Sequence, residues 1–215
     1  MTTHDSLKWN EWLDTIYKDV QNLLTNRYIF REVQKIISSN PRIQIGSSFY
    51  DWMGSVYAAS QVIGVRRQVD ADSDSISFRN LLDEIRQHAH ILSRERYVSL
   101  YKDSGLPNDI PHRDFDRKAG TGRNHIDPVV VEADLSALQE KAERIRKYVN
   151  KRIAHFDRAE FKSLPTYAEL DECLDYLEAL LKKYLSLLQA KTHLSIVPVW
   201  QYDWKEIFRR PWIEK

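Results

Sequence analysis

The chain has 215 residues, of which 42% are hydrophobic and 29% are charged, a composition typical of a globular protein with one domain. Thirty-two basic and 31 acidic side chains give a formal net charge of +1, so no global field directs the chain to nucleic acid or to a membrane. Only six glycines and seven prolines are present, which disfavours a turn-rich β-sandwich or β-barrel.

The single cysteine, Cys173, has no partner for an intrachain disulfide, as is usual in reducing compartments. No apolar run approaches the roughly 18 residues that a membrane span needs. The N-terminal residues lack the basic and apolar regions of a secretory signal. We therefore expect a cytoplasmic protein without a membrane partner.

Three helices are predicted in the first half of the chain. Apolar residues recur at three- and four-residue steps through residues 1–40 and predict one long helix that ends at Asn40. A second helix is predicted over residues 47–69, where small residues such as Gly64 permit close packing of a neighbouring helix. A third is predicted over residues 77–92, with a serine at its N-cap.

The apolar period is lost over residues 102–128, which predicts a long mobile loop. A fourth helix is predicted from Asp134 to Phe156, with one apolar stripe. The sequence Thr166-Tyr-Ala-Glu169 is a capping box, and it predicts that a fifth, leucine-rich helix begins there.

Three of the six tryptophans fall in the last residues of the chain: Trp200, Trp204 and Trp212. Aromatic residues at this density are not typical of disorder, so residues 196–215 are predicted to form an extended arm packed on the helices. The predicted fold is an all-α bundle of about five helices over residues 1–195, with the tryptophan-rich arm at its C-terminal end.

The predicted fourth helix carries a local excess of positive charge. Between positions 144 and 158 the basic residues are Arg144, Arg146, Lys147, Lys151, Arg152 and Arg158, against the single acidic residue Asp157. Arg144, Tyr148, Lys151 and His155 share one face of that helix. Cations beside an imidazole can bind a phosphodiester and transfer a proton near neutral pH. The alternative is a solvated basic flank in which His155 pairs with Asp157.

Residues 148–157 (YVNKRIAHFD) resemble the RN-K-x-x-A-H-x-D signature of HEPN proteins, particularly the AbiU-like branch associated with abortive infection. Residues 63–70 (IGVRRQVD) and 75–82 (SISFRNLL) are similar to the RR-x-x-D and SIS-x-x-x-LL patterns of that branch. The matched segments lie in the expected order within residues 45–190.

The resemblance implies a helical bundle that forms homodimers and, in catalytic members, a metal-independent ribonuclease without a cofactor. Asn150, His155 and Asp157 match the motif, whereas Val149 stands where an arginine is usual. The catalytic candidates are therefore His155 and Asn150, with Arg146 or Arg152 as the substitute cation. The candidates for binding nucleic acid are Arg144, Lys147, Tyr148, Lys151, Arg66 and Arg67. RNA, a second copy and an antitoxin or operon partner are the expected partners.

Two other interpretations stay open at this point. A non-catalytic HEPN-like module would bind RNA or a partner protein through the same basic face, and a helical interaction protein would share only the fold. Arg66 or Arg67 is equally able to form a surface ion pair with Asp70 at helical spacing.

Overall fold

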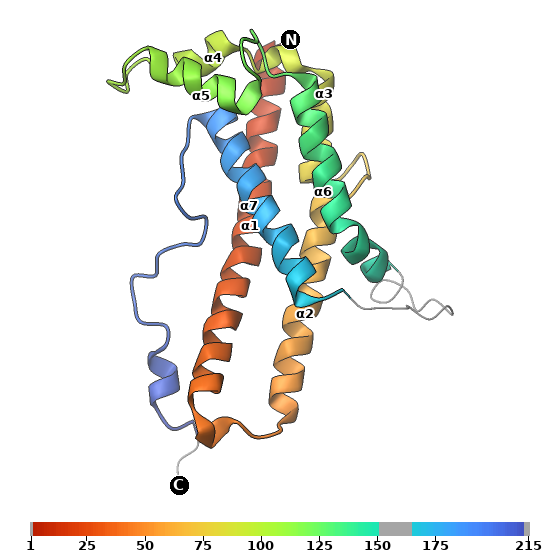
Figure 1. Ribbon diagram of the computed structural model, residues 1–215, viewed down its shortest axis with the longest axis vertical. Helices are drawn as coiled ribbons and strands as arrows, with labels where there is room; N and C mark the ends of the chain where they lie inside the picture. The colour runs from red at the N-terminus through yellow and green to blue at the C-terminus, as the bar shows by residue number, and fades with distance from the viewer. Residues whose placement is uncertain (1, 151–164, 213–215) are drawn as a thin grey trace.

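The protein is an all-α bundle, as predicted, in a computed structural model that describes residues 2–150 and 165–212 (Figure 1). The α-helices within these ranges are α1 (Thr2–Ser39), α2 (Ser48–Gln68), α3 (Phe78–Gln87), α4 (Arg94–Ser99), α5 (Asp109–Ala119), α6 (Pro128–Tyr148) and α7 (Tyr167–Gln189). Short 3₁₀ turns are η1 (Pro41–Ile43), η2 (Ala89–Ile91) and η4 (Glu206–Arg209). In Figure 1, α1 and α2 form a long hairpin, and α4 and α5 lie across the opposite end of the bundle.

The core forms where α7 packs against α1 and α6, and where α3 packs against α6. Helix α7 buries a leucine-rich face that includes Leu174, Leu177 and Leu181. Helix α1 contributes Trp9 and Leu13, which are fully buried. Burial of this apolar area is the main favourable term that holds the bundle together. None of the described helices is both long and apolar enough to cross a bilayer.

Three of the predicted helix starts are confirmed by the caps. The Ser77 hydroxyl accepts the Asn80 N–H at the start of α3. The Ser47 hydroxyl accepts the Phe49 N–H at the start of α2. Thr166 and Glu169 form the reciprocal capping box at the start of α7. Each cap satisfies N–H groups that have no partner inside the helix.

Other boundaries were predicted wrongly. The third helix ends at Gln87 instead of continuing to residue 92, and a 3₁₀ turn and α4 follow it. Helix α6 begins at Pro128, six residues before Asp134, because the Asp127 carboxylate caps the Val129 N–H and proline suits the first helical position.

The predicted loop over residues 102–128 contains a helix, α5. Pro111, Phe115 and Ala119 recur at four-residue steps and are all buried. Three apolar residues on one face are enough to pack a short helix against the bundle. They are too few to give a recognisable helical period in a segment that is mostly charged.

A polar cluster attaches α4 and α5 to α7. The Tyr97 hydroxyl contacts both Asp114 and Ser186, and Lys118 donates to Ser186 at 2.6 Å and pairs with Asp114. Burial tends to raise the pKa of Asp114, but hydrogen bonds from Lys118 and Tyr97 outweigh it and lower the pKa below its ordinary value. The carboxylate is therefore stabilised in its charged form.

The C-terminal arm lies along α1, as predicted. Ile196 is buried, and the Trp200 ring stacks on Tyr28 with 5.1 Å between centroids. Lys205 pairs with Glu32 of α1. Trp212, in contrast, is 63% exposed, so only the first part of the arm's aromatic cluster is covered.

We predict that Trp200→Ala lowers the free energy of unfolding by about 1–2 kcal/mol, because it removes the stacked ring from α1. The melting temperature then falls by several degrees in a thermal denaturation scan. Trp212→Ala is the matched control and changes the melting temperature by less than half as much. Equal effects would contradict the packing of the arm.

We also predict that Asp114→Asn destabilises the protein at pH 7 and that this cost shrinks in acid. The folded pKa lies below the unfolded value, so the carboxylate's contribution is present above about pH 4 and is lost as the pH falls through its folded pKa. Urea denaturation at pH 7 and near pH 3 measures the difference. Asp109→Asn, at an exposed ion pair on the same helix, serves as control.

Candidate functional site

Two segments singled out in the sequence meet where α2 and α6 end. Arg66 Nε of α2 donates a hydrogen bond to Asn150 Oδ1, 84 residues away, at 3.0 Å. The same guanidinium pairs with Asp70 at 2.9 Å through Nη1. The expected ion pair with Asp70 is thus present together with a contact to the asparagine of the motif.

The position of Arg66 follows from the packing of α2 on α1. A Cβ added at Gly64 would lie 2.4 Å from Leu23 Cδ2, so glycine is what permits this close approach. Val62 and Val65 are buried on the same side of α2. With that face fixed in the core, Arg66 lies at the side of the helix that meets the end of α6.

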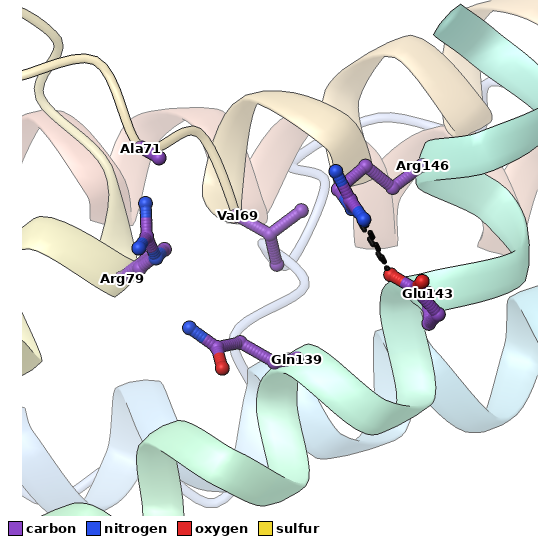
Figure 2. Close-up of a pocket in the computed structure, with 6 residues that line it drawn as sticks. All are labelled: Val69, Ala71, Arg79, Gln139, Glu143 and Arg146. Atoms are coloured by element: carbon purple, nitrogen blue, oxygen red, sulfur yellow. Dashed lines mark hydrogen bonds and ion pairs between the residues drawn. The ribbon is translucent and has the colours of Figure 1, made fainter. Parts of the chain in front are cut away.

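A polar pocket of about 280 Å³ lies beside this contact, between α6 and the segment that joins α2 to α3 (Figure 2). Figure 2 shows that Arg79 of α3 lies across the pocket from Gln139 and the ion-paired residues Glu143 and Arg146 of α6. The remaining lining residues are Val69 and Ala71.

Arg79 differs from the other arginines near the pocket. Its side chain is half-buried and has no ion pair or hydrogen bond within the part of the chain that the structure describes. A guanidinium that lines a pocket without an acidic partner among the described residues favours an anionic ligand, because its planar donors match two oxygens of a phosphate or carboxylate.

Glu143 limits how much positive charge the α6 side of the pocket offers. Hydrogen bonds from Lys147 and Arg146 lower the pKa of this carboxyl. It is therefore ionised at neutral pH and offsets part of the charge of both cations. The Arg79 side of the pocket is the better place for an anion.

In the described part of the predicted basic stretch, which ends at Asn150, the cations of α6 form ion pairs. Arg144 pairs with Glu169 of α7, and Lys147 pairs with Glu143. Lys141, one turn earlier, pairs with Glu172 of α7. Arg67 points to α1, where it pairs with Asp19, and Tyr148 is half-buried. The structure therefore brings Arg66, Arg146 and Asn150 to one region, and it does not leave Arg144 and Lys147 as unpaired cations.

Position 149, where the HEPN motif usually has arginine, is inside the core. Val149 is only 3% exposed. An arginine at this position would bury a charge without a partner, which is strongly unfavourable. Lys151, Arg152, His155 and Asp157 lie outside the described residues.

Five of the six pocket residues were not among the sequence candidates, and three of these five are polar: Arg79, Gln139 and Glu143. A signal for them was present, because Arg79 belongs to the SISFRNLL segment that carried the resemblance. Gln139, Glu143 and Arg146 follow one another at steps of four and three residues, which places them on one face of α6.

No family model, curated protein or solved structure matches this chain.

We predict an energetic coupling of about 1 kcal/mol between Arg66 and Asn150, because they share a charge-assisted hydrogen bond that is partly open to solvent. A double-mutant cycle with Arg66→Ala and Asn150→Ala, followed by chemical denaturation, measures it. The control cycle combines Arg67→Ala with Asn150→Ala, because the Arg67 side chain donates a hydrogen bond to Asp19 and not to Asn150. A coupling no larger than in the control would contradict the contact.

Proposed function

We propose that the chain is a HEPN-like, RNA-directed protein of the bacterial cytoplasm that acts in defence as a metal-independent ribonuclease or toxin. The observation that carries the proposal is the contact between Arg66 and Asn150 beside a polar pocket that holds the half-buried Arg79, which has no ion-pair partner among the described residues. A homodimer and an antitoxin or operon partner belong to the same proposal.

In this proposal, arginine guanidinium groups bind the phosphate of the RNA. Arg79 has no acidic partner among the described residues, so its planar donors are available for two phosphate oxygens. The Gln139 amide, on the opposite wall, offers both a donor and an acceptor to the edge of a base. Val69 supplies an apolar contact for the face of a ring.

The size of the pocket favours single-stranded RNA. A volume of about 280 Å³ is too small for a duplex, whereas one unstacked nucleotide of a loop or a free end fits such a space. Single-stranded segments also expose the base edges that side-chain amides read.

Arg66 is the best substitute for the arginine that the motif lacks. Val149 is buried and gives no access to a phosphate. Arg66 approaches Asn150 from α2 and occupies its Oδ1, which leaves the Nδ2 group to donate to a phosphate oxygen. His155 would act as general acid or base, a role implied by the resemblance.

A second candidate is a non-catalytic module that binds RNA or a partner protein. The neutralised cations of α6 and the buried Val149 favour it, because fewer groups are then free to stabilise the charge that develops during phosphoryl transfer.

Arg79→Gln is predicted to weaken the binding of a short single-stranded RNA and to reduce the salt slope of log K by about one, as expected for the loss of one phosphate contact. Fluorescence anisotropy over a series of salt concentrations measures both quantities. Arg113→Gln removes the same charge from an exposed position on α5 and serves as control. If the two variants behave alike, the pocket does not hold RNA.

For the catalytic form of the proposal, we predict that RNA cleavage persists in EDTA and that His155→Ala lowers its rate by about 10²–10⁴-fold while RNA binding is kept. Single-turnover cleavage assays measure the rate. A wild-type protein that binds RNA and never cleaves it would support the non-catalytic module. A wild-type protein that neither binds nor cleaves RNA would overturn the ribonuclease and the RNA-binding module, and would leave the module that binds a partner protein.

A further inference from the structure

A second pocket lies at the turn of the α1–α2 hairpin, where the C-terminal arm comes back to it (Figure 1). Its volume is about 460 Å³, which is within the range of pockets that hold small molecules. The end of α1, η1 and the start of α2 supply most of the lining, and the arm supplies the rest. We call this cavity the hairpin pocket.

The lining of the hairpin pocket is mostly aliphatic and aromatic. Helix α1 and η1 contribute Ile37 and Ile43, whereas α2 and the arm contribute Phe49, Phe208 and Trp212. Much of this apolar surface is open, because Phe49 is 48% exposed and Trp212 is 63% exposed. Apolar surface that is both concave and exposed is typical of a ligand-binding site.

Contacts within the protein hold the arm side of the pocket. Lys205 of the arm pairs with Glu32 of α1. The rings of Phe208 and Trp212 stack with 6.0 Å between their centroids, and Trp212 Nε1 donates a hydrogen bond to the Ile207 carbonyl at 3.1 Å. The pocket is therefore preformed, which lowers the entropic cost of binding a ligand.

The charged residues of the lining are two arginines, Arg42 and Arg210, and none of the described lining residues is acidic. Arg210 Nη2 lies 3.4 Å from an oxygen of Glu206, which is outside the lining. The Arg42 side chain has no ion pair or hydrogen bond within residues 2–150 and 165–212. Two guanidinium groups and one carboxylate leave one positive charge, which suits a ligand that carries one negative charge.

The hydroxyl groups of the lining are engaged in local hydrogen bonds. The Tyr50 hydroxyl donates to the Ile43 carbonyl at 2.8 Å, and the Ser47 hydroxyl accepts the Phe49 N–H at the start of α2. The guanidinium groups are thus the main donors that the pocket offers to a polar group of a ligand. The rest of the ligand must be apolar, because a polar group that is buried without a hydrogen bond is costly.

We infer that the hairpin pocket binds a free fatty-acid anion of medium chain length, with its alkyl chain against the isoleucines and phenylalanines and its carboxylate on Arg42. A volume of about 460 Å³ holds roughly 15 groups the size of a water molecule, which is close to the number of heavy atoms in dodecanoate. An intact bilayer does not enter a pocket of this size, so the occupant is a single molecule. Burial of the chain drives binding and the guanidinium selects the carboxylate, with an expected dissociation constant of about 10–100 µM.

Isothermal titration calorimetry with dodecanoate tests the inference. Wild type is expected to bind one dodecanoate per chain. Dodecyltrimethylammonium has the same alkyl chain and the opposite charge, and it is expected to bind at least about ten times more weakly. Arg42→Gln is expected to weaken dodecanoate binding about tenfold, with the melting temperature unchanged because Arg42 is exposed. Arg113→Gln, at an exposed position on α5, is the control and binds dodecanoate as wild type does.

The position of the alkyl chain is tested with Ile37→Trp, which fills part of the pocket and is expected to abolish binding while the helical content in circular dichroism is kept. No saturable binding of dodecanoate up to about 1 mM would overturn the inference. Equal affinities for dodecanoate and the cationic analogue, or equal losses in Arg42→Gln and Arg113→Gln, would do the same. Binding to phosphatidylglycerol vesicles without binding of monomeric dodecanoate would indicate a membrane-contact surface instead and would also overturn it. None of these readouts depends on RNA, so failure here is distinct from failure of the proposed function.

Discussion

The apolar seam in which α7 packs against α1 and α6 is the contact on which the rest of the structure depends. It buries the leucines of α7 and fixes the position of α6 relative to the α1–α2 hairpin. Because α3 packs on α6 and α2 packs on α1, the seam also sets where the ends of α2, α3 and α6 meet. The candidate site is built from those ends, so its geometry follows from the core.

The same seam explains why the basic face of α6 is weak. Packing α7 beside α6 brings Glu169 and Glu172 to the cations of α6, which are then used in ion pairs between helices. Such exposed pairs contribute little stability, but they do remove charge that a nucleic acid would otherwise meet. Within residues 2–150 and 165–212, a positive charge without an ion-pair partner is found instead at Arg79 of α3.

Local sequence signals predicted the long helices α1, α2 and α7 and the caps at Ser77 and Thr166 correctly, because these hydroxyls accept N–H groups within one turn. They missed the start of α6, which Asp127 caps. Local sequence signals did not predict α5, because its three buried apolar residues stabilise a helix only when they pack against the bundle. The sequence did not predict the contact between Arg66 and Asn150, which lie 84 residues apart. The pairing of Arg144 with Glu169 depends on how α6 and α7 pack, which no local pattern contains. The same holds for Arg79, which has no ion-pair partner in the part of the chain that the structure describes.

The central claim is that RNA binds where α2, α3 and α6 meet. Hydrogen–deuterium exchange, followed by mass spectrometry with and without a short single-stranded RNA, tests it most directly. The account predicts slower exchange in peptides that cover residues 65–80 and 136–150, with little change in α5 and in the C-terminal arm. Slower exchange confined to α5 or to the arm, with residues 65–80 unchanged, would contradict it.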